Sequence, residues 1–443
     1  MTTDQAPSRE PAPLSAWLFP AAAIAATTTA FCKQFTPFYH FHSTIIFVVA
    51  AFVSSLLILP VWKLRPELFQ KARSTAIVTL CIWACTALSY LLFARHSVPP
   101  TYLAGLVLFS GFFMLVGVAA SGSPRSIAVI FVMIAIIYLI YLARYVQHFG
   151  FLFPPKSLVD QFDFPDLFGD IFGLSSDPEA DRVDLYVTQY QNVGRFLALG
   201  ALAATMLIGN VRRRWVLGWM LVAATFVMVL WVGGRGALLA LAVSISIAVG
   251  RSRPVKTLVL IVATALLASG ALLVLAKVNF YIGIPVIDRT IDEIQHPNPR
   301  LRGPILEYLF AKLKDEPYSI ILGRGLGMFP VELGRPTPDW LIARPITGYP
   351  HNVILEALYE IGIGGMALFI VLIMIPIKRA WAIWASLNQD EFFVFQLYIF
   401  HLALLMVSGA LAYSYDFYFV LGLTIGTLRQ AAGGVSKKAV QAS

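Results

Sequence analysis

The feature that most constrains this 443-residue chain is the recurrence of apolar runs about 20 residues long, the length at which a helix crosses a bilayer. Only 13% of the residues are charged, against roughly 25% in an ordinary soluble domain. The sequence therefore predicts an all-α polytopic membrane protein. The twelve predicted spans are 16–32, 43–62, 75–94, 101–121, 126–147, 193–210, 215–232, 236–250, 257–277, 352–377, 391–411 and 413–429.

Basic residues in the short connections predict the orientation, because they stay on the cytoplasmic side of a membrane. Segments 62–73, 212–214 and 251–256 are rich in arginine and lysine and fall on one side. The short loops on the opposite side hold little beyond Arg95 and Arg235. With an even number of spans, both termini are predicted to be cytoplasmic. The overall excess of nine positive charges then marks orientation, and no nucleic-acid partner is expected.

Two long connections fall on the predicted outer face. The resulting divisions are a tail at 1–15, helices 1–9 at 16–277 with an outer loop at 148–192, a large outer loop at 278–350, helices 10–12 at 351–429, and a tail at 430–443. Within the large loop between helices 9 and 10, residues 303–315 read as an amphipathic helix, so this loop is predicted to be partly helical. A loop of this length in a compact protein is usually functional.

Two arginines stand where predicted spans begin on the outer face. Arg235 lies in the glycine-flanked stretch WVGGRGALL, where the backbone can come close to an anion. Arg195, in YQNVGRFLALG, lies where the first long loop re-enters the membrane. The alternative interpretation of both is an interfacial anchor with a snorkelling side chain.

The large outer loop adds further cations. They are Arg289, Arg300, Arg302, Arg324 and Arg344. Any one of them alone is expected to be a solvated surface residue. Together they make the loop suited to a phosphate or pyrophosphate ligand, whose oxygens guanidinium groups bind in a bidentate way.

His351 lies where the large loop joins the tenth predicted span. An imidazole can take a proton from a hydroxyl near neutral pH, a task for which arginine and lysine are poorly suited. The alternative interpretation is a helix-capping or hydrogen-bonding histidine at the interface. Beside an arginine-rich anion site, we expect His351 to be the catalytic base.

Several reaction classes lack their signatures. The outer loops contain no H-E-x-x-H, G-x-S-x-G or P-loop motif. The aspartates between 160 and 170 fit no calcium loop. No metal site and no cofactor is therefore predicted. The spans are nearly free of charge, which disfavours a pump or a secondary transporter.

Three segments, in this order, resemble the O-antigen ligase and polymerase superfamily. They are GRGALLAL, then RGPILEYLFAKL…EPYSIILGRGLGMFP, then HNVILEALYEIGIGG. The likeness covers residues 190–365, and the layout of spans around a large outer loop is closest to the ligase branch.

The resemblance implies an inner-membrane enzyme that is active at the periplasmic face. Such ligases transfer a polysaccharide from undecaprenyl pyrophosphate to a sugar hydroxyl of lipid A–core. By this likeness, Arg235 contacts the pyrophosphate and His351 is the base of a metal-independent, inverting transfer. Arg302 matches the loop arginine of the family, with Arg300 as the alternative, because Leu306 stands where the family often has tryptophan.

Other functions stay open at this point. A repeat-unit polymerase or a protein O-glycosyltransferase of the same superfamily would use the same donor and a different acceptor. From another class, a transporter of lipid-linked glycans would need cations deep within the spans. Here the basic residues lie at the ends of the spans instead.

Overall fold

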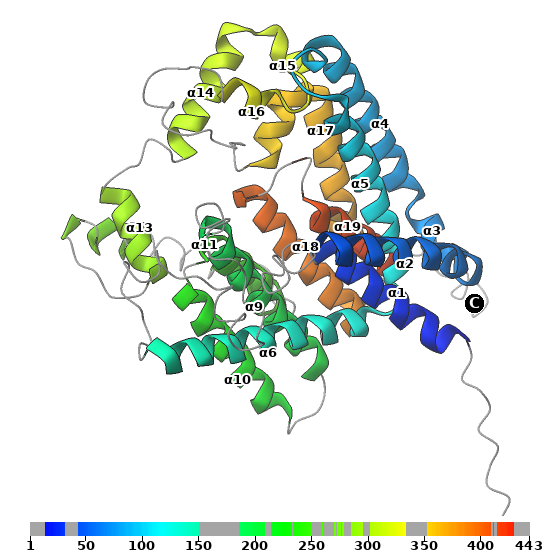
Figure 1. Cartoon of the computed structure of the whole chain (residues 1–443), viewed down its shortest axis with the longest axis vertical. Coiled ribbons are helices and arrows are strands. Elements are labelled where there is room, and N and C mark those ends of the chain that lie inside the picture. The colour runs from blue at the N-terminus through cyan, green and yellow to red at the C-terminus, as the bar shows by residue number, and fades with distance from the viewer. Residues whose placement is uncertain are drawn as a thin grey trace, which may run out of the picture.

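The computed structural model describes a chain built from helices (Figure 1). The described residues are 14–31, 43–149, 186–208, 214–232, 234–249, 285–295, 302–333, 352–408, 411 and 414–428, with short pieces between 259 and 278. No strand occurs among these residues. The longer helices are α1 (Leu14–Phe31), α2 (Ser43–Leu64), α4 (Arg73–Ser89), α5 (Pro100–Ala120), α6 (Pro124–Phe149), α9 (Tyr186–Ile208), α10 (Arg214–Val232), α11 (Arg235–Val249), α17 (Val353–Ala382), α18 (Gln389–Ser408) and α19 (Tyr415–Thr427).

Five helices within the described residues are long and apolar enough to cross a membrane. They are Ile46–Leu64, Arg73–Ala94, Pro100–Ala120, Val353–Ala382 and Gln389–Val407. Shorter apolar helices occur at Ala16–Phe31, Pro124–Ile140, Asn192–Ile208 and Arg235–Ile247. The prediction of an all-α membrane protein is thus supported, whereas the number of twelve spans stays a prediction. The ninth predicted span, 257–277, lies mostly outside the described residues.

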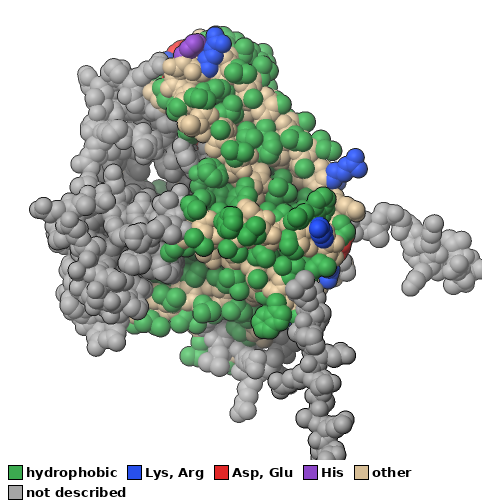
Figure 2. Space-filling view, turned by 45° about the vertical axis from the view of Figure 1, so that its right-hand side comes forward, with side chains coloured by type: hydrophobic (Ala, Val, Ile, Leu, Met, Phe, Trp, Pro, Cys, Tyr) green, Lys and Arg blue, Asp and Glu red, His purple; other side chains and the backbone are tan. Residues whose placement is uncertain are grey.

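The surface of the bundle is apolar, as lipid requires. Figure 2 shows one face on which hydrophobic side chains predominate and charged side chains lie at the edges. Large apolar residues such as Phe52, Leu80 and Leu108 point outward from α2, α4 and α5. Exposure of this extent suits a hydrocarbon environment and would make a protein in water aggregate.

Small residues bring the most extensively packed pair of helices, α5 and α19, into close contact. A Cβ atom on Gly117 of α5 would collide with the Phe419 carbonyl oxygen, and one on Gly422 of α19 would collide with the Met114 carbonyl oxygen. Gly426, one turn further along α19, lies against the Ser121 side chain. Glycine at these positions lets two backbones approach closely, which is how helices associate tightly in membranes.

Contacts among the connections form two separate groups. In the first, Arg379 Nη2 at the end of α17 donates to the Lys71 carbonyl oxygen (2.8 Å), and Lys71 Nζ donates to the Gly426 carbonyl oxygen (3.1 Å). Lys71 belongs to α3 (Pro66–Lys71), a short helix in the basic connection 62–73. The second group joins the α4–α5 connection to the large loop, where Gly327 lies against Val98. Because successive predicted spans cross the membrane in opposite directions, the sequence also predicts the connection 62–73 on one side and the α4–α5 connection with the large loop on the other.

The described part of the large loop is a helical layer beyond one end of α4 and α17 (Figure 1). It comprises α14 (Arg302–Asp315), α15 (Tyr318–Leu322) and α16 (Met328–Leu333). A helix therefore occupies the predicted segment 303–315. Another helix of this loop, α13 (Pro285–Gln295), stands apart from the layer and contacts α10.

α17 is broken at Gly362, and the helical layer fills the break. Gly362 has φ +72°, which ends the regular ladder and leaves two carbonyl groups without their helical donors. The Arg324 N–H donates to the Tyr359 carbonyl oxygen (2.8 Å). The Gly325 N–H (3.0 Å) and the Ser89 hydroxyl (2.7 Å) donate to the Glu360 carbonyl oxygen. Irregular backbone in a membrane protein is tolerated where protein satisfies its polar groups in this way.

Candidate functional site

The structure brings together the backbones that precede two of the predicted site arginines. A Cβ atom on Gly194 of α9 would lie 3.5 Å from the Gly234 Cα atom. Arg195 follows the first glycine, and Arg235 follows the second as the first residue of α11. Gly194, at the start of the apolar stretch of α9, and Gly234, just before α11, are therefore neighbours in space. In the sequence, the two positions share only a glycine followed by an arginine.

The other predicted site residues are placed less completely. Arg289 lies within α13, and Arg302 is the first residue of α14. Arg300 and His351, together with the loop residue Arg344, lie outside the described residues. Their roles therefore stay predictions.

The start of α17 next to His351 is capped by Asn352. Its Oδ1 atom accepts hydrogen bonds from the backbone N–H groups of Ile354 (3.1 Å) and Leu355 (3.2 Å). Asparagine is among the preferred N-cap residues, because its side chain satisfies the first free N–H groups of a helix. Capping this helix therefore does not require His351, so one alternative interpretation of the histidine is weakened.

Acidic side chains in the first turns of α17 hold neighbouring segments. Glu356 is buried, and its Oε2 atom accepts a hydrogen bond from the Leu411 N–H (3.0 Å), just before α19. Glu360 is buried one turn further along, close to the N–H groups of Gly327 and Phe329 but without a hydrogen bond of normal geometry to either. Glu356 thus ties α17 to the segment before α19, and Glu360 is buried beside the start of α16.

Arg195 forms an ion pair with Asp416, the second residue of α19. Only 14% of the Arg195 side chain and 7% of the Asp416 side chain are exposed. The Arg195 guanidinium also lies over the Phe31 ring, 5.9 Å from its centre. His401 of α18 reaches the same carboxylate, with Nε2 3.7 Å from Asp416 Oδ2. The resulting polar cluster joins α9, α18 and α19.

Sequence reasoning did not single out Asp416 or His401. A signal was present, because an ionisable residue in or beside an apolar run is costly and calls for a partner. The sequence does not show that Asp416 pairs with Arg195, because the two residues are far apart in the chain.

Arg324 has carboxylate partners and is no free cation of the loop. Its Nη1 atom lies 2.6 Å from Glu316 Oε2, and its Nη2 and Nε atoms lie 2.8 and 2.9 Å from Glu332 Oε1. Glu332 also accepts a hydrogen bond from the Tyr359 hydroxyl of α17. This network, which we call the Arg324 lock, ties α15 and α16 to the broken helix. Arg324 thus stabilises the fold of the loop and is unsuited to the ligand role considered from the sequence.

Tyr308 of α14 borders the lock and gives it a pH dependence. Burial and the Glu332 carboxylate raise the pKa of Tyr308 to about 12. The protonated Tyr308 hydroxyl contributes fully to the free energy of unfolding below the ordinary tyrosine pKa of about 10. This contribution is lost as the pH rises through the raised pKa. We expect the tyrosinate absorbance of the wild type, minus that of Tyr308→Phe, to rise near pH 12. A difference that titrates at the ordinary value would contradict this.

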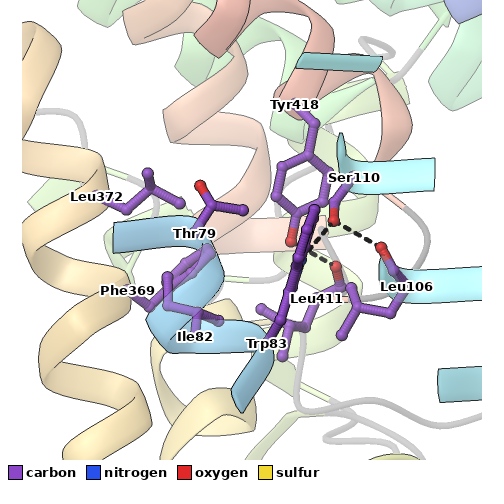
Figure 3. A pocket seen from close by; sticks show the side chains of 9 residues that line it. All are labelled: Thr79, Ile82, Trp83, Leu106, Ser110, Phe369, Leu372, Leu411 and Tyr418. Carbon is purple, nitrogen blue, oxygen red and sulfur yellow. Dashed lines mark hydrogen bonds between the residues drawn. The ribbon is translucent and has the colours of Figure 1, made fainter. Parts of the chain in front are cut away.

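A pocket among the spans offers no charge to an anion (Figure 3). It lies between α4, α5, α17 and α19, lined by Trp83, Ser110 and apolar neighbours such as Phe369. The Trp83 indole N–H donates to Ser110 Oγ (3.0 Å), and the Ser110 hydroxyl donates to the Leu106 carbonyl oxygen (2.6 Å). Its polar groups are therefore already paired. In the part of the chain that the structure describes, no group of three His, Cys, Asp or Glu residues could hold a metal ion.

The chain was compared with protein-family models and with curated proteins. No protein-family model matches it, and no curated protein matches it significantly.

Proposed function

We propose that this protein is a glycosyltransferase of the bacterial inner membrane. It transfers O-antigen polysaccharide from undecaprenyl pyrophosphate to a sugar hydroxyl of lipid A–core. The observation that carries the proposal is the close approach of Gly194 to Gly234, which brings together the backbones next to Arg195 and Arg235. In this proposal Arg235, the first residue of α11, and Arg195, once it leaves Asp416, bind the two phosphates of the pyrophosphate.

The chemistry follows from the leaving group. The acceptor hydroxyl oxygen attacks the anomeric carbon while the bond from that carbon to the pyrophosphate oxygen breaks, and the anomeric configuration inverts. His351 takes the hydroxyl proton. Negative charge grows on the pyrophosphate, and fixed arginines stabilise it by several kcal/mol for each well-placed donor. Arg302, Arg300 and Arg289 of the large loop are further candidates for this contact. The reaction needs no metal ion.

The proposed site lies at the periplasmic face, with both termini in the cytoplasm. Arg195, Arg235 and Asn352 all follow predicted outer connections. Donor and acceptor lipids would both reach this face from the outer leaflet, with the apolar spans holding the polyprenyl tail. Alignment of the reacting groups by the loop then supplies part of the rate enhancement.

Transfer by the purified protein tests the proposal. The assay contains a synthetic undecaprenyl-pyrophosphate glycan, lipid A–core and EDTA. We expect product from the wild type, and a fall of about 10²–10⁴-fold for His351→Ala, because the base is lost. For Arg235→Ala we expect a fall of about 10²-fold or more, because a donor to the leaving group is lost.

His96→Ala is the matched control, because His96 is an exposed histidine of the α4–α5 connection whose partner is its neighbour Arg95. Its activity should equal that of the wild type. Wild-type activity in His351→Ala and Arg235→Ala would overturn the proposal. A wild type that elongates lipid-linked glycan but ignores lipid A–core would identify a polymerase instead.

A further inference from the structure

Two nitrogen atoms from different helices converge on one carboxylate oxygen. Arg195 Nη2 of α9 pairs with Asp416 Oδ2, and His401 Nε2 of α18 lies 3.7 Å from that same oxygen. The His401 side chain is fully buried. Asp416 Oδ2 is thus paired with one cation, Arg195, and lies close to His401, which becomes a cation when it is protonated.

The tautomer of the neutral His401 ring follows from its other nitrogen. Nδ1 lies 2.8 Å from the Leu397 carbonyl oxygen. A carbonyl oxygen only accepts hydrogen bonds, so Nδ1 carries a hydrogen and donates it. In the neutral ring Nε2 then has a lone pair, and it has no hydrogen-bond partner within the described residues. A lone pair facing a carboxylate is acceptable only while Arg195 compensates the negative charge.

Arg195 is the member of this cluster that lies beside the proposed ligand site. Its Nε atom is buried and makes no hydrogen bond to any described residue. Its backbone adjoins Gly234, where the proposed pyrophosphate contact begins. An anion there would compete with Asp416 for the guanidinium. If Arg195 leaves, a buried carboxylate loses the one cation that binds it in the described part of the chain, which is costly unless another charge replaces it.

We propose that His401 replaces Arg195 on Asp416 when Arg195 turns to an anionic ligand, so that pyrophosphate binding takes up one proton. This inference rests on the proposed function for the identity of the ligand. The proton goes to Nε2 of His401. Moving about 1 Å closer would then give the Nε2–H group a charge-assisted hydrogen bond to Oδ2.

Other charged groups around His401 leave this exchange as the simplest compensation. The charged residue of α11 is Arg235, and those in the first turns of α17 are Glu356, which already accepts from the Leu411 N–H, and Glu360. The ring of Phe31 is what α1 places against His401, and α1 contains no titratable side chain. His401 is the only group shown near Asp416 that gains positive charge by protonation.

Calorimetric titration measures the proton directly. Purified protein in detergent is titrated with farnesyl pyrophosphate at about pH 8, where phosphate groups with a last pKa near 6 are fully ionised. Repeating the titration in buffers of different ionisation enthalpy gives the number of protons taken up. We expect about one proton for the wild type, because the neutral imidazole becomes a cation.

Variants separate the exchange from other proton sources. His401→Gln should bind the ligand with no proton uptake and lose the pH dependence of affinity, which in the wild type should approach tenfold per pH unit. Asp416→Asn, which needs no compensating cation, should also take up no proton. His96→Gln, the exposed control, should behave as the wild type.

The outcomes distinguish the two proposals. Ligand binding by the wild type without proton uptake overturns the exchange, whether or not the protein transfers glycan. Proton uptake in a protein that transfers no glycan supports the exchange and overturns the proposed function. Uptake that persists in His401→Gln assigns the proton to another group and overturns the role of His401.

Discussion

Replacing Gly422 by alanine is expected to destabilise the protein by about 1–3 kcal/mol, the usual cost of overpacking. The added methyl group would overlap the Met114 carbonyl oxygen of α5, and backbone atoms cannot rotate away as a side chain can. Gly117 faces the same contact from the other helix, so relief would require α5 and α19 to separate. A larger side chain, as in Gly422→Leu, is expected to prevent the contact. Thermal unfolding of the purified protein in one detergent measures the effect.

Gly364→Ala provides the matched control. Gly364 also lies in a membrane helix, α17, but a Cβ atom there would have no atom within 4 Å. Its replacement should change stability by less than about 1 kcal/mol, and the better helix propensity of alanine favours a gain. Equal destabilisation by both alanines would show that the α5–α19 packing described above is wrong.

Arg324→Met is expected to cost about 3–5 kcal/mol, because it removes one partner of a buried ion pair and leaves Glu332 uncompensated. Glu332 is 7% exposed and also holds the Tyr359 hydroxyl. We expect the helices α14, α15 and α16 to detach from α17 and to become sensitive to protease. Limited proteolysis with identification of the cleavage sites, together with thermal unfolding, tests this.

Arg65→Met removes a comparable but exposed ion pair. Its side chain and that of Glu67 are 57% and 51% exposed, so the loss should be no more than about 1 kcal/mol. The double variant Arg324→Met/Glu332→Gln should recover part of the stability lost in Arg324→Met, since no unpaired carboxylate remains. A single Arg324→Met variant as stable and protease-resistant as the Arg65→Met variant would contradict the lock.

The helical class and the presence of helices long enough to cross a membrane follow from the sequence, because the length of an apolar run and the demands of lipid both act locally. The helix at Arg302–Asp315 was equally predictable from its amphipathic pattern. The break at Gly362 was not, since glycine is common in membrane helices and hydropathy does not report φ angles.

Pairing between distant side chains was also beyond the sequence. Arg324 looked like one of several loop cations, and only the fold shows Glu316 and Glu332 on either side of it. Arg195 was predicted as a ligand-binding cation from its place at a helix start, but its pairing with Asp416 depends on how α9 and α19 pack. Arg235 remains a prediction supported by the contact between Gly194 and Gly234.

The break in α17 has a consequence for biogenesis. Carbonyl groups of Tyr359 and Glu360 are satisfied by atoms of Ser89, Arg324 and Gly325, which all precede α17 in the chain. This span is therefore not a self-sufficient unit for release from the translocon into lipid. We expect its lateral exit to wait until the preceding loop has docked, which makes docking of the loop a checkpoint for membrane insertion.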